Sequence, residues 1–325
     1  MDLRIYGVAG KRIGGGESYM AALVDALSVR HSVRVVDSPD EANVCQANDR
    51  PYGPKLVYIL QVPYGPFHLG QRILRGDIRE FRHDLERLRL LADARRSSLV
   101  IVYSDFVRNE FARRGIDTTV LYPPVEDFAS DLPKKKVVIS VGRFFEKRIY
   151  NHKRYEDLIE AFKLFYKKRP GWEYRIIGGA NPGELRYVEK LEKRALGYPI
   201  DFFVNAPERE LRLHYGEATL FWHGAGLGAT SPDQCEHFGI STVEAMSAGC
   251  VPIVPHGGGD EILSHWMAGY LYNTVDELVT FSMALADNPD WRERNASNGK
   301  IRAANFSTEK FRSRALAIFD TLEAK

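Results

Sequence analysis

Two glutamates separated by seven residues, Glu236 and Glu244, are the side chains in this sequence best suited to bind a polar ligand. Residues 243–248 have the spacing of a short helix, for which Ser241 or Thr242 is a suitable N-cap. Glu244 is therefore expected in the first helical turn, and Glu236 on the loop before it. Free amides at a helix N-terminus favour phosphate, and nearby carboxylates accept hydrogen bonds from hydroxyl groups. This combination predicts a binding site for a sugar phosphate.

The same stretch allows two other interpretations. Glu244 could do no more than complement the dipole of its helix. Alternatively, residues 224–229 fit the glycine pattern of a dinucleotide-binding turn, with Glu244 in the place of its acidic residue. Such a turn leads directly into a helix, but here Thr230, Ser231 and Pro232 follow the glycines. We therefore reject a dinucleotide site.

A second group of residues suited to face a ligand lies near the N-terminus. A β-type run at residues 3–8 precedes a glycine-rich turn that ends with Gly15 and Gly16, and a helix is expected at about 17–29. A strand, a glycine-rich turn and a helix start form the phosphate-facing loop of an open α/β sheet, because glycines let the backbone approach the ligand. A plain tight turn between strand and helix is the alternative.

The elements that would position these residues alternate between strand and helix along the chain. The alternation is interrupted at residues 122–133, where three prolines indicate a linker. We expect a doubly wound parallel sheet in residues 1–127, a second one in residues 134–307, and a final helix in residues 308–325. Strands are predicted at 3–8, 33–36, 43–45, 55–60, 99–103, 119–122, 137–141, 173–177, 201–204, 218–222 and 251–254.

A long amphipathic helix is predicted at residues 72–95, with an apolar stripe on one side and many arginines on the other. A stripe of this kind commonly packs against a sheet. A basic amphipathic face also suits an anionic membrane surface. Both interpretations stay open at this point.

Composition restricts the class of protein. The 325 residues are 44% hydrophobic and 27% charged, which suits two globular domains of ordinary size. A net charge of +2 gives no general attraction for nucleic acid. Three cysteines without C-x-x-C spacing fit reduced thiols, and neither a signal peptide nor a membrane-spanning stretch is recognisable. We therefore expect a cytoplasmic protein whose membrane contact, if it has one, is peripheral.

The sequence from Glu236 onward reads EHFGISTVEAMSAGCVPIV, followed by a turn at Gly257, Gly258 and Gly259 and then by Glu261. This segment resembles the donor-binding motif of the retaining glycosyltransferases of family 4. The resemblance implies the GT-B architecture, an α/β fold in which two Rossmann-like doubly wound domains face each other across a cleft.

In that family the first glutamate of the motif contacts the hydroxyls of the sugar, and the second contacts the ribose of the nucleotide. The resemblance therefore implies these roles for Glu236 and Glu244. It also implies that the residues between them, Phe238, Gly239 and Ile240, line the donor site.

A second stretch resembles the other strong motif of the family. It comprises VGRFFE at residues 141–146 and NHKR at residues 151–154. In the family an arginine and a lysine at these places hold the donor diphosphate, which implies that role for Arg143 and Lys153. The reaction needs such cations, because negative charge builds up on the leaving phosphate as the glycosyl bond breaks. A guanidinium can bind two phosphate oxygens at once, whereas an ammonium acts as a point charge.

Residues that follow predicted strands complete the expected donor site. By resemblance, Gly179, Asn205 and Ala206 line the nucleotide, in the crevice at the carboxyl ends of parallel strands. His223 also follows a strand and could contact the ligand, although a structural role is equally common for such a histidine. In family 4 the glycine-rich segment that corresponds to Gly15 and Gly16 faces donor and acceptor.

Two features bear on the mechanism. The sequence contains neither Asp-x-Asp nor His-Glu-x-x-His, so we expect transfer without a metal ion or other cofactor. Family 4 commonly has a histidine in the first domain, but the matching segment here places Gln61 at that position. Glutamine can hydrogen-bond a hydroxyl but cannot accept its proton near neutral pH. The leaving phosphate is then the expected base.

The sequence thus predicts a retaining glycosyltransferase that moves a hexose, such as mannose, from a GDP-, UDP- or ADP-sugar to a glycan or lipid-linked acceptor. The short sequences EHFGI and Asn-His-Lys resemble those of mannosyltransferases of lipid-linked oligosaccharide assembly and of polysaccharide-building enzymes. Two alternatives stay open. One is a non-catalytic nucleotide-sugar-binding module, and the other is a different GT-B activity such as a nucleotide-sugar epimerase or a phosphorylase.

Overall fold

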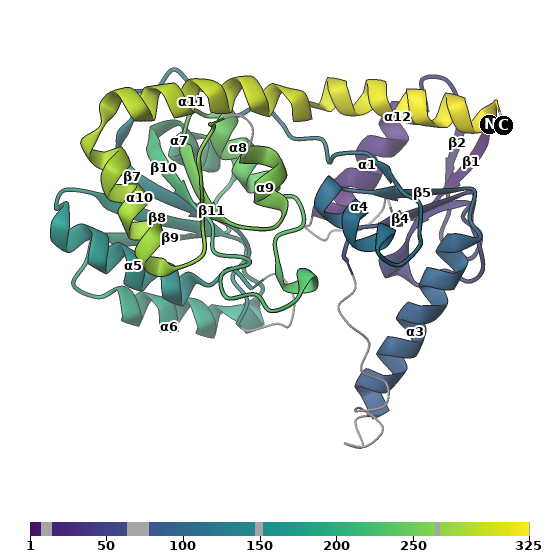
Figure 1. Cartoon of the computed structure of the whole chain (residues 1–325), viewed down its shortest axis with the longest axis horizontal. Coiled ribbons are helices and arrows are strands. Elements are labelled where there is room, and N and C mark those ends of the chain that lie inside the picture. Colours follow the sequence, from purple (N-terminus) through teal and green to yellow (C-terminus); the bar gives the residue numbers. More distant parts are fainter. Residues whose placement is uncertain (8–14, 64–77, 147–151, 264–266, 325) are drawn as a thin grey trace. The chain divides into compact units, whose positions relative to one another are not determined.

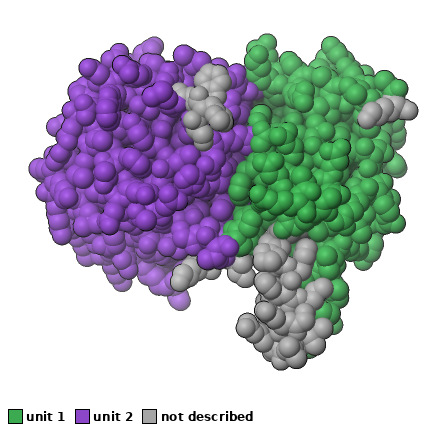
Figure 2. All heavy atoms as spheres, viewed as in Figure 1, with its two compact units in different colours: residues 1–124, 231–233, 308–325 green, residues 125–230, 234–307 purple. Residues whose placement is uncertain are grey.

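The computed structural model describes residues 1–325 except 8–14, 64–77, 147–151, 264–266 and 325. The chain forms two compact units, which have different colours in Figure 2. Unit 1 contains Met1–Pro124, Ser231–Asp233 and Thr308–Lys325, and unit 2 contains Val125–Thr230 and Gln234–Ser307. The first passage from unit 1 to unit 2 falls within the proline-rich segment at residues 122–133.

The described part of unit 1 is built on a six-stranded sheet with the strand order β2-β1-β3-β4-β5-β6, in which the pairings are parallel. Parallel neighbours need crossover connections, which is why strands alternate with helices in the sequence. The strands are β1 (Asp2–Ile5), β2 (Ser32–Val35), β3 (Val44–Gln46), β4 (Val57–Leu60), β5 (Leu99–Val102) and β6 (Thr119–Val120). The helices are α1 (Gly15–Leu27), α3 (Ile78–Arg95), α4 (Asp105–Ala112) and α12 (Thr308–Glu323), with a 3-10 turn at Ala47–Asp49.

The C-terminal helix α12 belongs to the core of unit 1, where it packs beside α1 (Figure 1). Tyr19 of α1 meets Phe311 of α12 edge-on, with 5.3 Å between the ring centroids. Phe319, two turns further along α12, is fully buried. Burial of one such side chain stabilises a fold by about 1.5–3 kcal/mol. The end of the chain is therefore part of what stabilises unit 1.

The described part of unit 2 has a second six-stranded sheet, again parallel, with the order β12-β11-β10-β7-β8-β9. The strands are β7 (Lys135–Val141), β8 (Glu173–Gly178), β9 (Ile200–Val204), β10 (Ala218–Trp222), β11 (Val251–Pro255) and β12 (Tyr270–Tyr272). The helices are α5 (Tyr155–Lys168), α6 (Leu185–Ala195), α7 (Glu208–Glu217), α8 (Ile240–Ser247), α9 (Gly258–Leu263), α10 (Val275–Asp287) and α11 (Pro289–Ala303), with 3-10 turns at Pro182–Glu184 and Ala304–Phe306. A further 3-10 turn, Pro232–Gln234, includes residues of both units.

The strand order of unit 2 reverses direction between β7 and β10, because β8 and β9 continue on one side and β11 and β12 on the other. Ligands of open α/β sheets bind in the crevice beyond the carboxyl ends of the strands at such a reversal. The topology therefore points to the residues that directly follow β7 and β10.

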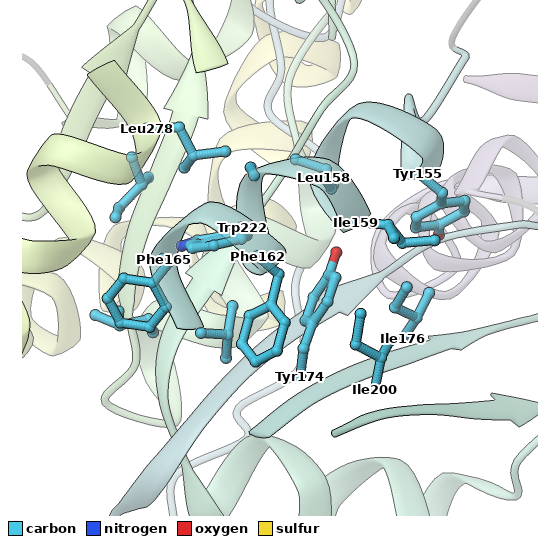
Figure 3. Close-up of a cluster of buried hydrophobic side chains, with 14 of the residues drawn as sticks. Tyr155, Leu158, Ile159, Phe162, Phe165, Tyr174, Ile176, Ile200, Trp222 and Leu278 are labelled. Carbon is cyan, nitrogen blue, oxygen red and sulfur yellow. The ribbon is translucent and has the colours of Figure 1, made fainter. Parts of the chain in front are cut away.

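An aromatic cluster fixes helix α5 against this part of the sheet (Figure 3). The ring of Phe162 lies 5.3 Å from that of Tyr174 on β8 and 6.2 Å from that of Trp222 on β10. At the start of the same helix, the Tyr155 hydroxyl donates to the carbonyl of Gly142, directly after β7, at 2.9 Å. The segment that enters α5 is thus held at the carboxyl end of β7.

The predicted α/β alternation agrees with these elements, and the differences are local. The sequence pattern misses α4, α9 and β12, which are short. The expected turn at the three glycines from Gly257 is wrong in part, because Gly258 and Gly259 begin helix α9. Strand β1 ends at Ile5, and residue 8 of the predicted strand lies outside the described residues, as do residues 72–77 of the helix predicted at 72–95.

Candidate functional site

Four of the predicted site residues stand directly beyond strands of unit 2. Arg143 comes two residues after β7, Gly179 follows β8, Asn205 follows β9 and His223 follows β10. Because these strands are parallel neighbours, their carboxyl ends lie at one edge of the sheet. At this edge the loops after β7 and β8 are in contact, since a Cβ atom on Gly178 would collide with the carbonyl of Gly142.

Glu236 is the centre of a buried cluster at this edge. Its Oε2 atom lies 2.9 Å from Nζ of Lys153 and 2.9 Å from Nε2 of His223. The side chains of Glu236 and Lys153 are less than one-fifth exposed, and that of His223 is 3% exposed. The cluster therefore brings together residues from the entry to α5, the end of β10 and the loop before α8.

The pKa shifts of Glu236 and His223 determine which of their atoms carry a proton at neutral pH. Burial by itself would raise the pKa of Glu236, but the charge of Lys153 and the hydrogen bond from His223 outweigh it and hold that pKa well below its usual value. Burial lowers the pKa of His223, and the neighbouring Lys153 lowers it further. At neutral pH we therefore assign an ionised Glu236 and a neutral His223 whose Nε2–H donates to the carboxylate.

Glycines allow the loop that carries Glu236 to pack closely. The amide of Gly258 donates to the carbonyl of Glu236 at 2.6 Å, and a Cβ atom on Gly258 would collide with the backbone of Phe238. Gly239 has a φ of 102°, which residues with a Cβ atom rarely adopt. Phe238 itself is buried and meets Phe306 edge-on at 5.2 Å. The conformation of this loop therefore requires glycine at positions 239 and 258.

Glu244 lies on α8, but not where the sequence pattern predicts it. Helix α8 begins at Ile240 with Gly239 as its N-cap, so Ser241 and Thr242 are inside the helix and Glu244 is its fifth residue. The expectation of a first-turn carboxylate is thus wrong, because the left-handed conformation of Gly239 starts the helix early. The Tyr215 hydroxyl lies 2.9 Å from Oε2 of Glu244. Burial raises the pKa of Glu244 to about 7.

The two predicted phosphate-binding cations both have a carboxylate beside them. Lys153 pairs with Glu236, as described above. Arg143, whose side chain is 45% exposed, has a guanidinium nitrogen 3.7 Å from Oε1 of Glu184. That these two cations contact a diphosphate stays a prediction. Such contact requires that a phosphate displace the neighbouring carboxylate or bind the cation together with it.

Asn205 organises the backbone beyond β8 and β9. Its side chain accepts a hydrogen bond from the amide of Ala180 at 2.9 Å and donates to the carbonyl of the same residue at 3.1 Å. With φ at 55°, Asn205 adopts a left-handed conformation that asparagine tolerates better than most residues. It therefore joins the segment after β8, which carries Gly179, to the segment after β9, which carries Ala206. That these residues bind the nucleotide stays a prediction.

The remaining predicted residues belong to unit 1. Gly15 and Gly16 are the first residues of α1, and residues 8–14 of the glycine-rich turn lie outside the described part of the chain. Gln61 directly follows β4, where its side-chain amide donates to the side-chain carbonyl of Gln46.

Sequence reasoning missed two residues that contact predicted site residues. Tyr215 contacts Glu244 from α7, and Glu184 lies beside Arg143 from the turn before α6. Neither residue belongs to a motif, and Tyr215 and Glu244 are 29 positions apart in the sequence. The only available signal for Glu184 was its position shortly after the β8 strand end.

Within the described residues, no group of three or more His, Cys, Asp or Glu side chains is arranged to hold a metal ion. None of the described helices combines the length and the apolar character that are needed to cross a bilayer. The prediction of metal-free transfer remains to be tested in solution.

Comparison with known sequences gives a family match. The family model described as "Glycosyl transferases group 1" matches residues 125–302, which is 178 of the 325 residues. The GDP-Man:Man(3)GlcNAc(2)-PP-Dol alpha-1,2-mannosyltransferase of Xenopus laevis is 30% identical over 225 residues, covering 63% of this chain and 44% of that protein. The Homo sapiens protein of the same name is 29% identical over 244 residues, covering 66% and 46%. The chain thus spans less than half the length of these relatives.

Comparison with solved structures supports the fold. Anabaena Alr3699/HepE in complex with UDP matches with a TM-score of 0.72 at 18% identity, covering 100% of both chains. Sucrose-phosphate synthase from Thermosynechococcus elongatus matches with a TM-score of 0.71 at 18% identity, covering 99% of both chains. These likenesses confirm the GT-B fold class that the sequence predicts.

Proposed function

This chain belongs to the group 1 glycosyl transferases, and on that premise we propose that it transfers a hexose from a nucleoside diphosphate sugar to an acceptor hydroxyl. The observation that carries the proposal is the cluster of Glu236, Lys153 and His223 at the strand-order reversal of unit 2. An ionised carboxylate there can accept hydrogen bonds from sugar hydroxyls, and the adjacent ammonium can meet the phosphate attached to that sugar.

The reaction would break the bond between the sugar C1 and the diphosphate oxygen and form a bond between C1 and the acceptor oxygen. Arg143 and Lys153 would stabilise the negative charge that the diphosphate gains. The acceptor proton would pass to the leaving diphosphate, because Gln61 cannot accept it. This route retains the configuration at C1, as the resemblance to family 4 implies.

Glu236 has a second task in this scheme, which follows from its contacts. Its carboxylate holds both Lys153 and His223, so it fixes the ammonium in place before the donor arrives. A positioned charge stabilises a transition state more than a mobile one, because no reorganisation is needed during the reaction. We therefore assign Glu236 both to the sugar hydroxyls and to the orientation of Lys153.

For the donor and acceptor we propose GDP-mannose and a lipid-linked glycan. The names of the Xenopus laevis and Homo sapiens relatives support this choice. A lipid-linked acceptor would require contact with a membrane surface. Helix α3 supports such contact, since it exposes Leu85 and Leu88 beside the exposed Arg82.

The test is a panel of GDP-, UDP- and ADP-sugars, in which calorimetry measures binding and the released nucleotide measures turnover. We expect one GDP-sugar to bind and to be hydrolysed slowly without an acceptor. The Glu236→Gln variant keeps the shape of the side chain, so it serves as the matched control that loses turnover. If none of the donors binds, the proposed function is wrong.

A non-catalytic nucleotide-sugar-binding module is the second candidate, and the identity of Gln61 favours it. The panel separates the two functions, because a binding module would bind a donor without releasing nucleotide under any condition. Release of nucleotide that continues without sugar transfer when an acceptor is supplied would instead favour an epimerase, and phosphate-dependent cleavage would favour a phosphorylase.

A further inference from the structure

Tyr215 approaches Glu244 as a fixed hydrogen-bond donor. Its hydroxyl lies 2.9 Å from Oε2 of Glu244 and 3.2 Å from the carbonyl oxygen of Ser241. A phenol has one hydrogen to donate, so it can satisfy only one of these acceptors fully. Burial and the adjacent Glu244 raise the pKa of Tyr215 well above its usual value, and the hydroxyl therefore keeps its proton.

The rest of the Tyr215 residue is held from three sides. Its fully buried ring meets Phe128 edge-on, with 5.1 Å between centroids. Its carbonyl oxygen accepts hydrogen bonds from Nζ of Lys134 at 3.1 Å and from Sγ of Cys250 at 3.3 Å. Lys134 also donates to the carbonyl of Ala248, just after α8, at 2.6 Å. The hydroxyl of Tyr215 is thus placed by the same network that holds the end of α8.

Several neighbouring groups shift the pKa of Glu244, and the Tyr215 hydroxyl is one of those that lower it. Burial raises the pKa of Glu244, and Glu126 and Glu208 raise it further, whereas Tyr215 and Arg212 lower it. Arg212 hydrogen-bonds both Glu126 and Glu208, so much of its charge is already compensated. Among the described residues, Tyr215 supplies the side-chain hydrogen bond to the Glu244 carboxylate.

We propose that Tyr215 is a positioning residue, which favours the ionised form of Glu244 and holds its carboxylate in the orientation that can accept hydrogen bonds from the ribose diol of the donor. The inference rests on the proposed function, because it requires that Glu244 bind the ribose. It adds a residue outside both motifs and a dependence of donor affinity on pH. A protonated carboxyl group cannot accept from both hydroxyls of a diol as a carboxylate can. Donor affinity therefore falls as the pH drops through about 7.

The Tyr215→Phe variant removes the hydroxyl and keeps the ring against Phe128. Loss of a hydrogen bond to a charged group moves the midpoint of the Glu244 titration upward by about one to two pH units. The ionised fraction at pH 7 then falls, and the affinity for GDP falls with it by about four- to eightfold. At pH 9 the variant recovers to within about twofold of the wild type. A purely structural defect would instead weaken binding equally at every pH.

The experiment has two readouts on the 325-residue chain. Difference infrared spectroscopy follows the carboxyl band of the ligand-free protein between pH 5 and 9, with Glu244→Gln identifying the band. Calorimetry measures GDP affinity over the same range, with UDP as a second probe. Tyr174→Phe is the matched control, because Tyr174 is equally buried and hydrogen-bonds Ser140 at 2.8 Å. We expect the control to titrate like the wild type.

The outcomes separate this inference from the proposed function. A Tyr215→Phe protein that has the wild-type titration midpoint and wild-type GDP affinity at pH 7 overturns the positioning role. If Glu244→Gln binds GDP and UDP as tightly as the wild type does, the donor site in the proposed function fails, whatever the infrared midpoint. A raised midpoint together with affinity that recovers at pH 9 supports the inference.

Discussion

The buried ion pair between Lys153 and Glu236 allows a quantitative test of the site. The two charged atoms are 2.9 Å apart, and the side chains are 17% and 19% exposed. At an effective dielectric constant of about 20, Coulomb attraction at this distance amounts to about 6 kcal/mol. Much of it offsets the cost of removing both charges from water. Removing one partner is costlier than removing both, because it leaves a buried charge uncompensated, typically at about 3–5 kcal/mol.

We therefore expect Lys153→Met to lower the free energy of unfolding of unit 2 by about 3 kcal/mol at pH 7. The double variant Lys153→Met/Glu236→Gln should regain a large part of that loss, because no charge is then left in the cluster. His223 remains in both variants and can still donate to the residue at position 236. The comparison thus isolates the charge from the loss of packing.

Urea unfolding monitored by tryptophan fluorescence provides the assay. The three tryptophans among the described residues, Trp172, Trp222 and Trp291, belong to unit 2, so their signal reports that unit. A double variant that is no more stable than Lys153→Met, or a single variant as stable as the wild type, would show that the pair is not a buried interaction of this kind.

The pH dependence of the stability difference has a definite sign. The depressed pKa of Glu236 means that its pairing stabilises the wild type above the unfolded-state pKa of about 4.3, and that this contribution is lost only as the pH falls through the lower folded-state value. Without Lys153 the pKa of Glu236 rises, and so does that of His223, which Lys153 also lowers. As the pH falls, Glu236 of the variant therefore becomes protonated, or His223 becomes charged beside it, at a higher pH than in the wild type. The difference should be largest near pH 7 and should narrow toward pH 4. A constant difference would contradict the charge argument.

Four further predictions concern catalysis. Glu244→Gln should raise the KM for the donor by roughly tenfold with little change in kcat, because the ribose is bound alike in ground and transition states; a loss confined to kcat in steady-state kinetics would contradict this. Arg143→Ala should lower kcat by about a hundredfold or more, and Arg143→Lys should not restore it, since the forked contact is lost. A normal kcat in the Arg143→Ala variant would refute the phosphate role. Activity should survive EDTA, and a full loss that manganese or magnesium reverses would overturn metal-free transfer. Gln61→Ala should cost little, whereas a hundredfold fall in kcat would place Gln61 in the chemistry.

The sequence alone was sufficient for the class of fold and for placing several of the predicted site residues directly after strands. Apolar runs alternate with amphipathic segments at the spacing of strand–helix–strand units, and this local pattern defines two parallel sheets. Glycines and polar residues directly follow several strands, as at Gly142 and His223, so their place at the carboxyl edge follows from topology. Periodicity was weaker at element ends, because one residue such as Gly239 can begin a helix earlier through its left-handed conformation.

Which of the site side chains contact each other was decided by the tertiary structure alone. Lys153 and Glu236 are 83 residues apart, and Tyr215 and Glu244 are 29 apart, so no local spacing relates them. Their contacts depend on the order of strands in the sheet and on the close approach of the loops that glycines such as Gly258 permit. The proton positions depend on the same contacts, because burial and neighbouring charges set the pKa of a carboxyl group. A sequence motif names both glutamates alike, yet burial among different partners leaves Glu236 ionised and brings Glu244 close to half protonation at neutral pH.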